Sequence, residues 1–126
     1  MSWTPVHLPG DYPPPAGAYS PAVRAGNLVF VSGQLPRDPR TRQVVGTDIA
    51  SQTRQVFANI EVILSAAGVT MRDIVSVTVY LADMSHWPAF DAVYREIMEP
   101  PYPARAAVGT QLNGALVEVS VIAQGA

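Results

Sequence analysis

The sequence predicts an α/β fold, more specifically an α+β two-layer sandwich in which two helices cover one face of a mixed six-stranded sheet. Residues 74–81 alternate between an apolar set and a largely hydroxyl-bearing set of side chains, which is the period of a strand. Apolar residues at 49–67 and 87–98 recur at the spacing of amphipathic helices. Further strand-like runs flank both helices, and this alternation is typical of a sheet layered against helices.

The N-terminal part divides into an arm and the start of a single domain. Residues 1–17 contain five of the twelve prolines and predict an extended arm with little regular structure. Residues 18–126 are expected to form one domain, with strands at 18–24 and 28–32 joined by a turn. An arginine-rich loop then leads to a helix that begins at Thr47 or Asp48 and stops at Gly68.

The C-terminal half supplies the rest of the sheet. After the strand at 74–81, a helix is expected from Ser85 or His86 to the proline pair at 100–101. Two strands are expected at 103–108 and 115–123, and the Asn-Gly pair at 113–114 between them predicts a hairpin. These last two strands should therefore lie side by side.

An uncovered apolar face predicts self-association. The two helices cover only one face of a six-stranded sheet. The other face is left uncovered, although the strand at 28–32 is apolar on both of its sides. Exposed apolar surface of that size is rare on monomers, so we expect copies of the chain to cover one another.

Composition excludes several classes of chemistry. The chain has no cysteine, which removes disulfides, thiolate nucleophiles and cysteine-ligated metals. All eight basic residues are arginines, so Schiff-base catalysis and the P-loop lysine are excluded as well. The net charge of -2 argues against a nucleic-acid partner. No signal or membrane-spanning segment is apparent, which favours a cytoplasmic location, and His7 and His86 lie too far apart to suggest a metal site.

Arg105 and Glu118 are the two charged residues of the last expected strands. Arg105 lies among small alanines, which leave room for a guanidinium to bind a carboxylate with two parallel hydrogen bonds. Glu118 lies between valines, and partial desolvation should raise its pKa into the range of a general base. A structural role stays open for each residue. In that interpretation, Arg105 is a surface residue or forms an ion pair with Glu118, and Glu118 is an edge-strand residue that points into water.

Three further residues are candidates for lining a pocket. Tyr19 either closes a pocket with its phenol or packs on an edge strand. Ser32 ends a strand without the Gly-x-Ser-x-Gly pattern of a nucleophile elbow, so it is interpreted as a hydrogen-bonding residue. Gly33 permits an unusual backbone angle or the close approach of a ligand.

Several motifs, in this order and at these spacings, resemble the RidA (YjgF) family of reactive enamine/imine deaminases. The matching segments are 16–22, 31–36, 59–68, 73–75, 103–105 and 117–119, so the resemblance spans about residues 16–123. It implies a chorismate-mutase-like fold and a homotrimer whose ligand pockets lie between subunits. It also implies hydrolysis of 2-aminoacrylate and related 2-imino acids to 2-keto acids and ammonia, without metal or cofactor.

The same resemblance assigns roles by position. Arg105 would bind the substrate carboxylate and Glu118 would position the water, while Tyr19, Ser32 and Gly33 would line the pocket. Two residues depart from the commonest family pattern: Ala107 replaces a cysteine, and Asp91 replaces an asparagine before the helix tyrosine. The first bears on pocket size and polarity. Asp91 adds a negative charge near a site for an anion. Both replacements are therefore expected to affect which substrate the site accepts.

Two other functions compete with imine hydrolysis. A non-catalytic trimer would use the same cleft to bind or sense a 2-keto acid or another small carboxylate. A ribonuclease or translation inhibitor, a label that some family members carry, is the least supported, because the net charge is negative and the arginines are scattered.

Overall fold

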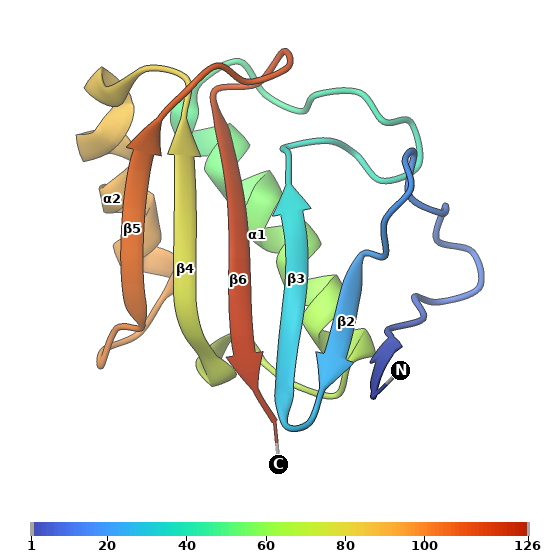
Figure 1. The fold of residues 1–126 in the computed structure, drawn as a ribbon. Helices are drawn as coiled ribbons and strands as arrows, with labels where there is room; N and C mark the ends of the chain where they lie inside the picture. Colours follow the sequence, from blue (N-terminus) through green and yellow to red (C-terminus); the bar gives the residue numbers. More distant parts are fainter. Residues whose placement is uncertain (1, 126) are drawn as a thin grey trace.

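The computed structural model describes residues 2–125 and confirms a mixed six-stranded sheet with two helices on one face (Figure 1). The strands are β1 (Trp3–Pro5), β2 (Ala22–Ala25), β3 (Leu28–Gln34), β4 (Ile74–Leu81), β5 (Ala104–Gly109) and β6 (Val117–Gln124). Their order across the sheet is β1-β2-β3-β6-β4-β5. Strands β4 and β5 run parallel, and the other neighbouring pairs of these six strands are antiparallel.

The helices are α1 (Ile49–Ala66) and α2 (Trp87–Ile97). Asp48 caps α1 as predicted, because its carboxylate accepts a hydrogen bond from the backbone N–H of Ser51 at 2.7 Å. Gly68, with φ of +79°, follows the end of α1, also as predicted. Helix α2 follows a short 3₁₀ turn (Met84–His86) and carries the chain from β4 to β5, the crossover that parallel strands require. Within residues 2–125, neither helix has the length and apolar character needed to cross a bilayer.

The hydrophobic core fills the space between the helices and the sheet. Strands β4 and β6 contribute alternate valines and leucine to it, and the helices contribute larger side chains. The fully buried members include Val77, Val79, Leu81, Val117, Val119, Ile60, Ile63, Leu64 and Phe90. Burial of each such side chain is worth about 1.5–3 kcal/mol before entropy is counted, so this layer fixes which face of β4 and β6 packs against the helices.

The opposite face of the sheet, which we call the open face, has no helix over it (Figure 1). Register places Tyr80 of β4 beside Glu118 of β6 and beside Val108 of β5 on this face. Phe30 and Val108 are exposed apolar residues of β3 and β5, with 38% and 46% of their surface accessible. The uncovered apolar face expected from the sequence is therefore present in the single chain.

The hairpin predicted at Asn113-Gly114 is wrong, because β4 lies between β5 and β6. The core-facing residues of β6 are all buried, so this strand takes the central position with a neighbour on each side. Apart from Arg105 and Val108, β5 consists of alanine and glycine; none of its residues is fully buried, and it forms the edge of the sheet. Gly114 does adopt a positive φ of 73°, but the turn belongs to the longer connection between the two strands.

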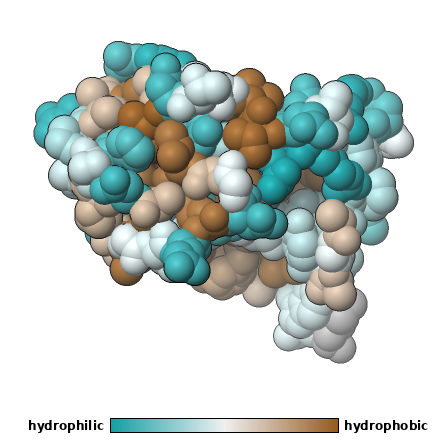
Figure 2. All heavy atoms as spheres, turned by 90° about the horizontal axis from the view of Figure 1, so that it is seen from above, coloured by the Kyte–Doolittle hydropathy of each residue, from teal (hydrophilic) through white to brown (hydrophobic). Residues whose placement is uncertain are grey.

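The N-terminal arm contains more structure than the sequence suggested. Trp3–Pro5 pairs with β2 and forms the sixth strand, although no strand was expected there. Arginines of the loop before α1 hold the arm: Arg40 forms an ion pair with Asp11 at 2.9 Å, and Arg42 donates to the carbonyl of Pro14 at 2.7 Å. Seen from above, hydrophobic residues gather over the sheet and helices, and the arm side at the right is mostly hydrophilic or neutral (Figure 2).

Candidate active site

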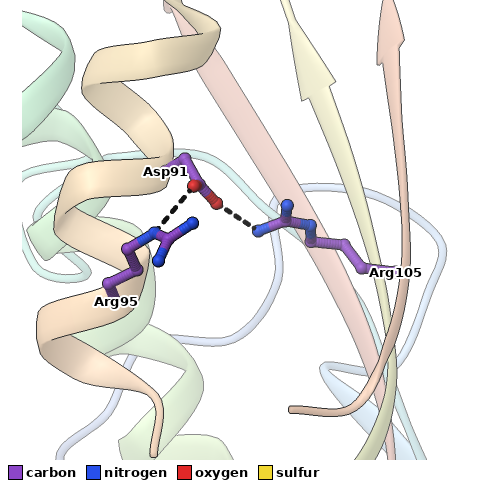
Figure 3. A network of polar contacts seen from close by, with 3 residues as sticks. All are labelled: Asp91, Arg95 and Arg105. Carbon is purple, nitrogen blue, oxygen red and sulfur yellow. Dashed lines mark hydrogen bonds and ion pairs between the residues drawn. The ribbon is translucent and has the colours of Figure 1, made fainter. Parts of the chain in front are cut away.

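Arg105 reaches from the edge strand β5 toward helix α2 (Figure 3). It is in register with the buried Val77, which places its side chain on the helix-facing side of the sheet. Its guanidinium carbon lies 4.5 Å from the ring centroid of Trp87 and 4.5 Å from that of Tyr94. Because these residues are seven apart, two turns of α2 present both rings on one face. The two rings fix the plane of the guanidinium through cation–π contacts.

Asp91 occupies the turn of α2 between these rings and binds two arginines. Its Oδ1 accepts from an Nη of Arg105 at 2.9 Å, and its Oδ2 accepts from Nε of Arg95 at 3.0 Å. Hydrogen bonds from Arg105 and then Arg95 lower the pKa of Asp91, so the carboxylate is ionised at neutral pH. Asp91 and Arg95 form this ion pair at i, i+4 spacing along α2.

One edge of the Arg105 guanidinium has no protein partner within residues 2–125. Its hydrogen bond there is to Asp91 through Nη1, which leaves Nε and Nη2 without a bond to these residues. The side chain is 22% exposed, so it is neither sealed in the fold nor extended into solvent. The Nε–Nη2 edge has the spacing that binds both oxygens of a carboxylate.

Glu118 lies on the open face, opposite Tyr80 of the neighbouring strand. Burial raises the pKa of this carboxyl, as its position between valines predicted. Gly33 of β3 lies against it: a Cβ atom at Gly33 would lie 2.6 Å from Oε2 of Glu118. A raised pKa favours the uptake of a proton by this carboxylate, as a general base requires.

Tyr19, Ser32 and Gly33 gather near the same end of β3. Tyr19 and Gly33 both line a cavity of about 350 Å³ between the N-terminal arm and the loop that follows β3. The hydroxyl of Ser32 donates to the carbonyl of Ser20 at 2.7 Å, so in this structure it holds the segment beside Tyr19. Tyr19 is 55% exposed, and its ring is free to contact a ligand or another chain.

Arg105 and Glu118 point to opposite faces of the sheet, with β4 between their strands. The expectation that they lie on neighbouring strands is therefore wrong, and a small ligand cannot contact both side chains within a single chain. They also do not form an ion pair, since Arg105 pairs with Asp91. Trp87 and Tyr94 belong to the apolar pattern at 87–98 that predicted an amphipathic helix, and no site was expected at them. Their i, i+7 spacing around Asp91 was the signal for an arginine site.

No group of three or more His, Cys, Asp or Glu side chains in residues 2–125 has the arrangement of a metal site. Tyr94 adds a feature that the sequence did not indicate: its hydroxyl is buried and has no hydrogen-bond partner within the described chain. Burial raises the pKa of Tyr94, and the nearby Arg105 opposes that shift. The phenol is thus protonated beside the guanidinium at neutral pH.

Comparison with known proteins places these residues in a family. Residues 10–125 match the family described as Endoribonuclease L-PSP. A RutC family protein of Pyrococcus horikoshii is 45% identical over 113 residues, which cover 88% of this chain and 90% of that protein. A protein named 3-aminoacrylate deaminase RutC, from Acinetobacter baylyi, is 40% identical over 94% of this chain and 95% of its own.

One further relative and two solved structures agree. A 2-iminobutanoate/2-iminopropanoate deaminase of Dermatophagoides farinae is 37% identical over 77% of this chain and 76% of its own. The crystal structure of yeast Mmf1 superimposes with a TM-score of 0.88 at 37% identity, covering 98% of this chain and 99% of that one. E. coli TdcF with bound serine superimposes with a TM-score of 0.83 at 29% identity, covering 91% and 94%. The chain therefore belongs to the Endoribonuclease L-PSP family, the RidA (YjgF) family that its motifs resemble.

Proposed function

We propose that this protein hydrolyses reactive enamine and imine intermediates, 2-imino acids of the 2-aminoacrylate type, to 2-keto acids and ammonia. Arg105 binds the substrate carboxylate, and Glu118 positions and deprotonates the attacking water. Tyr19, Ser32 and Gly33 line the pocket around the reacting carbon. The single observation that carries the proposal is the Arg105 guanidinium, held between two rings with its Nε–Nη2 edge free of protein partners in residues 2–125.

The site requires two copies of the chain. Arg105 and Glu118 lie on opposite faces of one sheet, so a single chain cannot bring both to a small ligand. The open face carries Glu118 together with exposed apolar residues such as Val108, and such a face is typical of a subunit interface. In a closed homotrimer, each cleft would join Arg105 of one copy to Glu118 of the next.

The chemistry needs few groups. The substrate reacts as its iminium form: water adds to C2, Glu118 accepts one proton of the water, and the C=N π electrons move to nitrogen, which gives a carbinolamine. Glu118 then passes this proton to the amine nitrogen. As the C2–N bond breaks and C2=O forms, the Glu118 carboxylate takes the proton of the carbinol hydroxyl and gives it to the departing ammonia, which leaves as ammonium. An enamine enters after a proton moves from nitrogen to C3. The raised pKa of Glu118 fits both proton transfers near neutral pH.

Relatives support the reaction class and the ligand class. Two are named as deaminases, of 2-iminobutanoate/2-iminopropanoate and of 3-aminoacrylate, and the TdcF structure contains serine, a small carboxylic acid. The family description also contains the word endoribonuclease. The net charge of -2 does not favour a polyanionic RNA substrate, so imine hydrolysis is the proposed activity.

The test generates imino acids with an L-amino-acid oxidase and traps the surviving imine with semicarbazide. The wild-type protein should reduce the trapped imine, and Arg105→Ala should lose nearly all of this effect, because the substrate loses its anchor. Arg54→Ala is the matched control: Arg54 is exposed and pairs with Glu96 on the helix layer, away from Arg105. It should retain wild-type activity.

Two outcomes would reject the proposal. If the wild-type protein does not accelerate imine loss for any amino-acid precursor, while a 2-keto acid raises its melting temperature through Arg105, the protein is a carboxylate-binding protein and not a deaminase. If Arg105→Ala and Arg54→Ala are equally active, Arg105 does not bind the substrate.

A further inference from the structure

Asp91 supplies a carboxylate to the same guanidinium that the proposed function assigns to the substrate (Figure 3). Its Oδ1 lies 2.9 Å from an Nη atom of Arg105, and the two side chains are similarly buried, with 21% and 22% of their surface accessible. A ligand carboxylate on the free edge of Arg105 would therefore share the guanidinium with Asp91. Both carboxylates would lie within a few ångströms of one cation.

The position of Asp91 is fixed from two sides. Its other oxygen, Oδ2, accepts from Nε of Arg95 one helical turn along α2, at 3.0 Å. The rings of Trp87 and Tyr94 hold Arg105 in plane from both faces. Because neither partner is free to turn away, the negative charge of Asp91 acts on any ligand that Arg105 binds.

The charge of Asp91 distinguishes ligands by their net charge. Like charges a few ångströms apart repel strongly in a partly buried site, since the effective dielectric constant there is well below that of water. A 2-keto acid carries an uncompensated negative charge and experiences this repulsion in full. A 2-iminium or 2-ammonium acid carries a positive nitrogen beside its carboxylate, which cancels part of the repulsion.

We infer that Asp91 is a specificity-determining residue that selects zwitterionic 2-iminium and 2-ammonium acids over anionic 2-keto acids. The inference rests on the proposed function, because it takes Arg105 as the carboxylate-binding group. Hydrolysis converts a ligand of the first kind into one of the second. Asp91 therefore weakens the binding of the product relative to that of the substrate, and product release is favoured once ammonia has formed.

The test compares the dissociation constants of L-alanine and pyruvate, measured by calorimetry at low ionic strength. Asp91→Asn keeps an oxygen for the hydrogen bond from Arg105 but removes the charge. The ratio of the pyruvate constant to the alanine constant should fall about tenfold in this variant, chiefly through tighter pyruvate binding. Asp11→Asn is the control, because it removes the same charge from an exposed ion pair with Arg40. The ratio should not change in this variant.

Arg95→Gln should change the ratio of the pyruvate constant to the alanine constant in the opposite direction. It removes the second cation from Asp91, so the ratio should rise, by about twofold to threefold because Arg95 is largely exposed and screened. If Asp91→Asn weakens both ligands equally or leaves the ratio unchanged, Asp91 has a structural role only and the inference is wrong. If neither ligand binds the wild-type protein, the carboxylate site of the proposed function is wrong as well.

Discussion

Gly33 and Glu118 are in contact because residue 33 has no side chain: a Cβ atom there would lie 2.6 Å from Oε2 of Glu118. Substitution Gly33→Ala should therefore displace the carboxylate from its position. If Glu118 directs the water, we expect kcat for imine hydrolysis to fall by about 10²-fold, a loss typical of a misplaced general base. The imine-trapping assay measures this loss.

The control for this substitution is Gly10→Ala, where a Cβ would meet nothing within 4 Å. Both glycines are exposed and neither needs a positive φ, so both variants should unfold at about the temperature of the wild-type protein. A fully active Gly33→Ala variant would show that the position of Glu118 does not limit the reaction.

Glu118→Gln should separate catalysis from stability. Without a base, kcat should fall by about 10²- to 10⁴-fold with a smaller change in KM. Because burial raises the pKa of Glu118, the free energy of unfolding of the wild-type protein falls as the pH rises through that pKa and the carboxyl ionises. Glu118→Gln should therefore be more stable than wild type at neutral pH and equal to it below the pKa of an unfolded glutamate. Urea titrations at pH 4 and pH 7 measure the difference.

The same pKa shift predicts the acid limb of the activity profile. Wild-type kcat/KM should rise with pH through a value above the ordinary range of a glutamate, since the ionised form accepts the proton from water. A limb at an ordinary glutamate pKa would contradict the raised value, and a Glu118→Gln variant that retains the limb would assign it to another group.

Val108→Glu should disrupt the assembly. Val108 is an exposed residue of the open face, and a buried, unpaired carboxylate at a subunit interface is strongly unfavourable. Val62→Glu is the matched control, because Val62 is similarly exposed on α1, on the helix side of the molecule. Sedimentation equilibrium should give about three times the 13.5 kDa chain mass for wild type and Val62→Glu, and a smaller mass for Val108→Glu. A wild-type mass of one chain would contradict the trimer.

Gln52→Ala should destabilise the fold without involving the site. Gln52 is a buried residue of α1 whose amide donates to the carbonyl of Gly46 at 3.1 Å and accepts from the N–H of Leu116 at 2.8 Å. Its loss leaves two backbone groups without partners, at a cost of about 2–3 kcal/mol. Glu61→Ala, an exposed change on the same helix, should stay within about 0.5 kcal/mol. Equal urea midpoints for both variants would contradict this role of Gln52.

Local pattern predicted the elements whose own sequence determines them. The period-two alternation gave β4 its correct bounds, and Asp48 and Gly68 marked the limits of α1, because capping depends on neighbouring residues alone. The partial desolvation of Glu118 was also anticipated, from the apolar residues on either side of it in β6.

Long-range choices could not be predicted in this way. The turn signal at Asn113-Gly114 was present, but burial decided the strand pairing. The core-facing residues of β6 are buried, so β6 lies between two strands, whereas the largely exposed β5 lies at the edge. The partner of Arg105 was missed for a similar reason, because its distance from Asp91 depends on how α2 packs against β5. Trp3–Pro5 shows no strand signal of its own and is held by pairing with β2.

The placement of Arg105 and Glu118 on opposite faces has a genetic consequence. If each cleft takes one residue from each of two copies, inactive Arg105→Ala and Glu118→Gln chains can complement one another. Every mixed trimer would contain one cleft built from the two intact halves, so co-expression would recover part of the activity that neither chain has alone. A heterozygous loss at either residue would then impair every assembly that contains a damaged copy.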